Sequence, residues 1–257
     1  MIPAERRQKL LDLISEQGTA TIADLSSIFA VSEMTIHRDL KYLETSGRVL
    51  KTYGGVIASE SFFESDYELR RQQNIESKQL IGKVAATLIS ENDSIILDGS
   101  TTVLAMVSEL VNKKNITVFT SSVAATSVLS TYKNIELYST GGLVLYGTNS
   151  YIGQYANEFL KNIHADKCFV SASAISASCG ITDPLSSISE IKRSIAKASK
   201  EVILLVDHSK FGLMNKFNSI CFSDIDLIIT DADETIPCVN DILKLGVEIL
   251  FVEPNHT

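Results

Sequence analysis

The chain of 257 residues is poor in the side chains that build metal centres and disulfide frameworks. Its four cysteines form no CxxC pair, and its four histidines form no ligand-like cluster with them. A chain of this length can bury a core without disulfide or metal staples. We therefore expect a reducing compartment, no bound metal and no other cofactor. The cysteines are Cys168, Cys179, Cys221 and Cys238.

Long apolar runs are also missing. The first residues, MIPAERRQKLL, turn charged at once and contain no apolar signal core. No stretch approaches the roughly 18 apolar residues that a membrane span requires. The sequence therefore predicts a soluble, cytoplasmic protein without a membrane partner.

The chain lacks an excess of positive charge, which at first argues against nucleic acid as a partner. Its formal net charge is −8, but residues 1–57 contain seven basic and seven acidic side chains, so all the net acidity lies in the remainder. Local charge rather than net charge meets a phosphate backbone. The second half of this N-terminal unit is rich in cations and histidine: His37, Arg38, Lys41, Arg48 and Lys51.

Residues 1–57 are predicted to form three short helices and a two-stranded wing. Pro3 suits the first turn of a helix, Thr21 and Asp24 form a capping box for a second helix, and Ser32 caps a third. In the third helix an apolar stripe at helical spacing is expected to face inward: Ile36, Leu40 and Leu43. The alternating segment RVLKTYGGVI, with its paired glycines, predicts the wing.

Two short helices joined by a tight turn fit the major groove of DNA when the second presents polar and cationic residues near its start. Base contacts are expected from Thr35, His37 and Arg38. The full set of predicted DNA-binding residues is Ser32, Met34, Thr35, His37, Arg38, Lys41, Arg48, Lys51 and Tyr53. A three-helix unit with a wing can also be a protein-interaction module whose cations only solvate a helix face, and the residues alone leave that alternative open.

Residues 58–76 have no clean core periodicity and are predicted to be a linker. From residue 77 to 257, short apolar runs alternate with helical patterns, which favours a largely parallel sheet covered on both faces. The predicted fold class is therefore α/β, with a winged helix-turn-helix over residues 1–57 and a Rossmann-like α/β domain over residues 77–257.

Ligands of open α/β sheets bind at the carboxyl ends of the strands, where this chain places polar residues. The first strand runs through DGSTT into a helix, an arrangement that suits a phosphate or carboxylate. Each such residue taken singly can also be only a helix cap or a turn. The candidate ligand-binding residues at strand ends are Asp98, Gly99, Ser100, Thr101, Thr102, Thr120, Gly141, Asp207 and Lys210.

The segment SEMTIHRDLKYLETSGRVLKTYGGV resembles the helix-turn-helix and wing of DeoR-type regulators. The chain departs from the family pattern at His37, where a second arginine is usual, and at Tyr53, where histidine is usual. Imidazole and guanidinium recognise bases differently, so the resemblance implies groove binding with a different operator preference.

The later segments DGSTT, TSS, TGG, GIT and DHSKFG, with Glu190 followed by Lys192 and Arg193, resemble the DeoR sensor domain, which is similar in fold to ribose-5-phosphate isomerase and CoA-transferase relatives. The resemblance implies a phosphosugar pocket that Glu190 and Lys192 complete. The segment SASAI at residues 171–175 replaces a glycine-rich stretch near an acidic residue, which removes a carboxylate from the pocket rim.

These observations predict a transcriptional repressor of sugar metabolism genes that binds double-stranded operator DNA under the control of a phosphorylated sugar. A homodimer or homotetramer suits a repeated operator. The main alternative is a sugar-phosphate isomerase carrying a DNA-binding domain, because Asp98, Asp207, Glu190 and Lys210 offer carboxylates and a cation. No base is paired with a defined acid at diagnostic spacing, so we expect no catalytic residues. A non-DNA adaptor is the third possibility.

Overall fold

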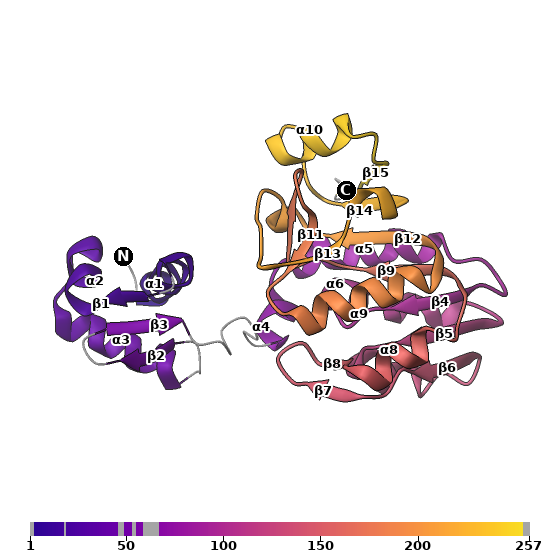
Figure 1. The fold of residues 1–257 in the computed structure, drawn as a ribbon, viewed down its shortest axis with the longest axis horizontal. Helices are drawn as coiled ribbons and strands as arrows, with labels where there is room; N and C mark the ends of the chain where they lie inside the picture. The colour runs from indigo at the N-terminus through magenta and orange to yellow at the C-terminus, as the bar shows by residue number, and fades with distance from the viewer. Residues whose placement is uncertain (1–2, 18, 46–48, 53–54, 59–66, 254–257) are drawn as a thin grey trace. The chain divides into compact units, whose positions relative to one another are not determined.

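The computed structural model describes residues 3–17, 19–45, 49–52, 55–58 and 67–253. The chain divides into two compact units, Met1–Asp66 and Tyr67–Thr257 (Figure 1). No helix among the described residues is long and apolar enough to cross a membrane.

The N-terminal unit is a three-helix bundle with a small antiparallel sheet. Its helices are α1 (Pro3–Gln17), α2 (Ile22–Phe29) and α3 (Glu33–Thr45), and its strands are β1 (Thr19–Thr21), β2 (Val49–Thr52) and β3 (Gly55–Ala58). In the order β1-β3-β2, strand β1 pairs with the wing strand β3. Strand β1 was not predicted, because the three residues TAT are too short to show a strand pattern. The core contains Leu10, Ile14, Leu25, Ile36 and Leu40, all with no exposed surface.

The predicted start of α2 is confirmed, because the Thr21 hydroxyl accepts a hydrogen bond from the Asp24 amide at 3.1 Å and donates to the Asp24 carboxylate at 2.7 Å. The helix ends at Ala30, whose φ of 50° is left-handed. The sharp turn that follows aims α3 away from α2.

An ion cluster that the sequence analysis missed joins α1 to α3. The Asp39 side chain is only 1% exposed and accepts from Arg6 Nε at 2.6 Å and Arg7 Nε at 2.8 Å. The Arg7 guanidinium also lies over the Tyr42 ring. These two arginines therefore compensate a buried carboxylate that would be costly if left alone.

The C-terminal unit is built on a seven-stranded parallel sheet of order β15-β14-β12-β9-β4-β5-β6. The strands are β4 (Ser94–Leu97), β5 (Ile116–Thr120), β6 (Ile135–Ser139), β9 (Ala165–Val170), β12 (Ser199–Val206), β14 (Leu227–Thr230) and β15 (Ile249–Phe251). Their carboxyl ends share one edge, so residues far apart in sequence meet there. The predicted α/β class and parallel sheet are confirmed.

Helices cover both faces of this sheet, as Figure 1 shows. Ile95, Leu97 and Phe169 pack in one cluster, with α5 (Ile75–Thr87), α6 (Thr101–Met106), the 3-10 helix η2 (Val107–Asn112) and α7 (Val123–Leu129). Ile96 and Cys168 face the opposite cluster, with α8 (Gln154–Leu160), α9 (Ser186–Lys197) and α10 (Pro237–Lys244). In β4, Ile95, Ile96 and Leu97 are all buried, so this strand is apolar on both sides.

Two small antiparallel sheets flank the main sheet and were not predicted. One is the hairpin of β7 (Leu143–Leu145) and β8 (Ser150–Ile152), and the other has the order β10-β11-β13, with β10 (Ala174–Ser176), β11 (Gly180–Asp183) and β13 (Phe217–Ile220). Short 3-10 helices complete the chain as η3 (His208–Lys210) and η4 (Phe222–Asp224).

The segment predicted as a linker, residues 58–76, contains helix α4 (Tyr67–Gln72) and the start of α5. Helix α4 packs against α6 and belongs to the C-terminal unit. Helix α4 was not predicted, because its six residues make less than two helical turns and show no clear apolar periodicity.

Candidate functional site

Helix α3 presents a polar face outward, as predicted. Ile36 and Leu40 are fully buried, whereas His37, Arg38 and Lys41 are exposed and Met34 is 70% exposed. Alternation at helical spacing produces this separation. Such a face can enter a groove and reach base edges or phosphates.

The other predicted DNA-binding residues lie at the start of α3 and in the wing. The Ser32 side chain caps α3, with its hydroxyl 3.3 Å from the Thr35 amide and 2.9 Å from the Thr35 hydroxyl. In the wing, Lys51 is exposed and pairs with Glu44 at 3.2 Å. Arg48 and Tyr53 lie outside the described residues.

At the carboxyl edge of the parallel sheet, Asp98 follows β4 and is 3% exposed. Its two oxygens accept from the amides of Ser100 at 2.8 Å and Ser171 at 2.9 Å. Burial raises the pKa of this carboxyl, and the charge of Lys192 and the hydrogen bonds oppose that rise. Two backbone hydrogen bonds thus hold the Asp98 carboxylate in place at the carboxyl edge of the sheet.

The hydroxyl groups predicted beside Asp98 have structural partners. The Ser100 hydroxyl caps α6 by accepting from the Val103 amide at 3.2 Å. Thr120 is fully buried, and its hydroxyl donates to the Leu97 carbonyl at 3.0 Å. Gly99 is required because a Cβ there would lie 1.8 Å from the Ser150 hydroxyl oxygen. These residues shape the edge, while Thr101 stays partly exposed and Thr102 is buried.

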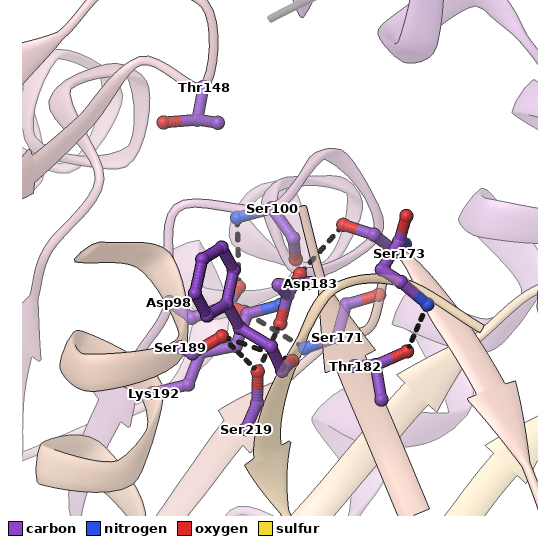
Figure 2. A network of polar contacts seen from close by, with 12 residues as sticks. Asp98, Ser100, Thr148, Ser171, Ser173, Thr182, Asp183, Ser189, Lys192 and Ser219 are labelled. Carbon is purple, nitrogen blue, oxygen red and sulfur yellow. Dashed lines mark hydrogen bonds and ion pairs between the residues drawn. The ribbon is translucent and has the colours of Figure 1, made fainter. Parts of the chain in front are cut away.

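A buried ion pair lies next to Asp98 (Figure 2). Lys192 Nζ donates to both oxygens of Asp183 at 2.7 and 2.8 Å, and Asp183 also accepts from the hydroxyls of Ser173 and Ser219, each at 2.6 Å. Burial alone raises the pKa of Asp183, but Lys192 and the hydroxyls outweigh it and lower that pKa. The pair therefore stays ionised beneath the site.

The two predicted members of α9 take opposite positions. Lys192 is 6% exposed, whereas Glu190 is exposed, since residues two apart on a helix point to different sides. The structure therefore brings Lys192, but not Glu190, to the group around Asp98. Asp183 was missed, although it directly follows the GIT segment.

A second carboxylate, Asp207, follows β12 and has no exposed surface. Its Oδ1 accepts from Asn74 Nδ2 and from the Ser209 amide, both at 3.0 Å. Burial raises its pKa, but the Lys210 charge and these hydrogen bonds outweigh burial and lower it. Lys210 therefore lies close enough to act on Asp207, in agreement with their predicted grouping. The hydrogen bond from Asn74, the residue before α5, was not predicted.

Lys78 on α5 is a further site residue that the sequence analysis missed. It is 4% exposed, and its ammonium donates to the carbonyls of Arg70 and Gln73 at the end of α4. Burial lowers its pKa from 10.5 to about 8, with Asp207 opposing the shift and Lys210 and Arg70 adding to it. A lysine in line with the buried Ile81 and Ala85 was the available signal.

Three buried side-chain oxygen atoms lack hydrogen-bond partners among the described residues. They are the Tyr67 hydroxyl, the Ser121 hydroxyl and Asp207 Oδ2. Ser121 follows β5 and Asp207 follows β12, so two of the three lie at the carboxyl edge. Buried unpaired groups are rare and call for a partner.

A cavity of about 360 Å³ lies between α4–α5 and α6–η2, and both Lys78 and Thr101 line it. Its size is in the range of small-molecule sites. Gly141 lies farther along the edge, beyond β6, with a left-handed φ of 62°. Among the described residues no cluster of three or more histidine, cysteine, aspartate or glutamate side chains is arranged to hold a metal ion.

Comparison with known proteins gives two family matches. Residues 6–62 match the model described as the DeoR-like helix-turn-helix domain, and residues 73–232 match the DeoR C terminal sensor domain. Helix α4 falls between the two matched regions.

Curated relatives cover nearly the whole chain. The HTH-type transcriptional regulator GolR of Listeria innocua is 38% identical over 233 residues, 90% of this chain and 91% of the relative. The HTH-type transcriptional repressor GlcR of Bacillus subtilis is 33% identical over 257 residues, 100% of this chain and 99% of the relative.

Among solved structures, ribose 5-phosphate isomerase A of Methanocaldococcus jannaschii is 18% identical, with a TM-score of 0.39 over 54% of this chain and 55% of the isomerase. A likeness this distant carries no conclusion about activity.

Proposed function

Since the chain belongs to the DeoR family of transcriptional regulators, we propose that it represses sugar metabolism genes and that a phosphorylated sugar controls its affinity for operator DNA. The observation that carries the effector part is the grouping of Asp98, Asp207, Lys78 and Lys210 at or beside the carboxyl edge of one parallel sheet. Carboxylates suit sugar hydroxyls, and ammonium groups suit a phosphate.

The DNA-binding part rests on the exposed face of α3. We propose that Thr35, His37 and Arg38 read base edges, and that Lys41 of the same helix and Lys51 of β2 hold phosphates. An operator with two half-sites is bound by two DNA-binding units, so we propose that the protein acts as a homodimer or homotetramer.

An isomerase activity finds less support from the site. Aldose–ketose isomerisation needs a carboxylate free to take a proton from carbon, but Asp98 is held by two backbone amides and Asp183 by Lys192. Glu190 is exposed on α9. Asp207 keeps one oxygen, Oδ2, without a partner among the described residues, so the proposal of a sensing role with no catalytic residue rests on the relatives named as regulators.

The test is fluorescence anisotropy of the full chain on DNA from its own promoter region at fixed salt, with and without a panel of sugar phosphates. We expect nanomolar-range binding that one sugar phosphate weakens. Tight DNA binding that no sugar phosphate in a broad panel alters would contradict the effector assignment. Absence of DNA binding would contradict the repressor assignment.

A further inference from the structure

Strand β6 forms one outer edge of the seven-stranded sheet (Figure 1). It pairs in parallel with β5, and no other described strand pairs with its outer side. The Thr140 amide donates to the Thr120 carbonyl at the end of β5. Because backbone groups alternate in direction along a strand, Leu137 and Ser139 direct their amides and carbonyls away from the sheet. An edge of this kind is a template for pairing with another strand.

The sequence of β6 lacks the features that commonly prevent such pairing. The strand IELYS contains no lysine and no proline, and its one charged residue is Glu136. That carboxylate accepts hydrogen bonds from the hydroxyls of Tyr138 at 2.7 Å and Thr117 at 3.2 Å. The opposite edge strand, β15, has only three residues, and a very short edge strand is itself protected from pairing. Of the two edges, β6 is therefore the one suited to a partner.

Tyr138 extends a row of aromatic rings to this edge. The Phe159 ring on α8 lies 6.1 Å from the Phe119 ring on β5, and Phe119 stacks on Tyr138 with ring centroids 5.3 Å apart. Tyr138 is 42% exposed although Phe119 covers one face of its ring. The row therefore ends in an uncovered aromatic surface, against which another ring can stack.

We infer that β6 pairs antiparallel with β6 of a second copy of the chain, about a two-fold axis at Tyr138. The inference rests on the homodimer or homotetramer of the proposed function and names its contact surface. In this register Leu137 lies opposite Ser139 of the second copy, so the outward amides and carbonyls of the two strands bond to each other. The two Tyr138 side chains face each other in a pair without backbone hydrogen bonds, where side chains are closest.

Charge favours this register over the neighbouring one. A two-fold axis at Leu137 would place the two Glu136 side chains at diagonal positions, about 7–8 Å apart. The axis at Tyr138 instead places Glu136 opposite Thr140, so the two carboxylates are well separated. A two-fold contact is self-complementary, and one surface therefore serves both copies. The resulting dimer supplies two N-terminal units for an operator with two half-sites.

Opposite charges introduced at Tyr138 test the contact, because a residue on the two-fold axis faces its own copy. Tyr138→Glu and Tyr138→Lys each place two like charges opposite one another and remove the ring pair. For each variant alone, we expect the dissociation constant of the step that halves the mass of the wild-type oligomer to rise at least about tenfold. An equimolar mixture of the two variants should restore association, since opposite charges then face each other across the strands.

Sedimentation equilibrium of the full chain without DNA measures these constants, and circular dichroism checks that each variant is folded. Leu250→Glu and Leu250→Lys are the matched controls, because Leu250 lies in the opposite edge strand β15 and is 40% exposed. We expect the Leu250 variants to associate like the wild type, alone and mixed.

Each other outcome overturns the inference. If the wild type is an oligomer and the Tyr138 variants associate equally well, the contact lies elsewhere and the proposed oligomer stands. If both Tyr138 variants dissociate and their mixture stays dissociated, Tyr138 does not face its own copy. If the Leu250 variants dissociate instead, the contact is at β15. A wild-type monomer would contradict both the contact and the proposed oligomer, while the DNA and effector assignments would still be tested separately by anisotropy.

Discussion

At the scale of single residues, the site depends on charges that are buried and paired within the protein. Lys192 and Asp183 are almost inaccessible, and two hydroxyls complete the coordination of the carboxylate. Removing one partner of such a pair leaves an uncompensated charge inside the protein. The pair is therefore expected to hold the floor of the site rather than to contact the effector.

Lys192→Met tests this role. We expect the free energy of unfolding, measured with urea, to fall by about 3–5 kcal/mol because Asp183 loses its counter-charge. Lys200→Met is the control, since Lys200 is 73% exposed where it pairs with Asp166, and exposed ion pairs contribute little to stability. Equal losses in the two variants would contradict the structural role of Lys192.

Lys78 predicts a pH dependence of effector binding. Its pKa in the free protein is lowered from 10.5 to about 8 by burial, with Lys210 and Arg70 adding to the shift and Asp207 opposing it. A bound phosphate raises that pKa, so the contribution of the ammonium to affinity is complete below pH 8 and declines as pH rises above it. The phosphate itself is already dianionic there, because its second pKa is about 6.

The measurement is titration calorimetry near pH 8 in two buffers of different ionisation enthalpy. Binding should take up a substantial fraction of a proton, up to about one half, since about half the Lys78 amines are neutral at their pKa. No proton uptake near this pH would contradict the placement of Lys78 against the anion.

At the scale of elements, α3 separates two kinds of contact along one helix. Arg38 lies in the second turn of α3, and Lys41 lies nearly one turn later. Arginine can bond two acceptors of guanine in a fixed fork, whereas lysine near a phosphate acts as a point charge. The two residues should therefore affect DNA binding differently.

Arg38→Ala is expected to cost about 1–3 kcal/mol on the preferred operator and to relax the preference at one base position. Lys41→Ala should weaken binding to all sequences similarly and reduce the salt slope by about one. Anisotropy on matched and mutated operators across a salt series measures both effects. Lys133→Ala, a change at an exposed cation in the C-terminal unit, is the control, and indistinguishable behaviour of Arg38→Ala and Lys41→Ala would refute the division of roles.

Some secondary-structure elements could be predicted from the local sequence, and others could not. Strands β4, β5 and β12 were predictable because each contains an apolar run that ends in polar residues, and α3 was predictable from its apolar stripe. The hairpin β7–β8 and the sheet β10-β11-β13 were not, because their short strands mix polar and apolar residues and are too short to show a clear alternation. Helix α4 was hidden for the same reason.

At the scale of the whole molecule, the sequence predicted the parallel sheet and the polar residues at its strand ends, but not which side chains face one another. Asp98, Asp207 and Lys210 were identified from their positions after strands. Lys78 and Asp183 were missed, since their roles arise from contacts between different elements: Lys78 with the end of α4, and Asp183 with α9 and β13. Glu190 has the sequence neighbours that the family pattern predicts, but its side chain is exposed on the side of α9 that faces away from Asp98.

We propose that each unit of the chain carries one binding surface and that the two surfaces are energetically coupled. If an effector lowers affinity for the operator by a given factor, the operator must lower affinity for the effector by the same factor. A repressor that responds to its ligand typically shows a coupling of about 1–3 kcal/mol, or 5–150-fold.

The most direct test measures both sides of this cycle on the full-length protein at one salt concentration. Anisotropy gives the operator Kd with and without saturating sugar phosphate, and calorimetry gives the sugar-phosphate Kd with and without saturating operator. The account predicts that both dissociation constants rise by the same factor of at least five. A sugar phosphate that binds without changing the operator Kd would contradict it.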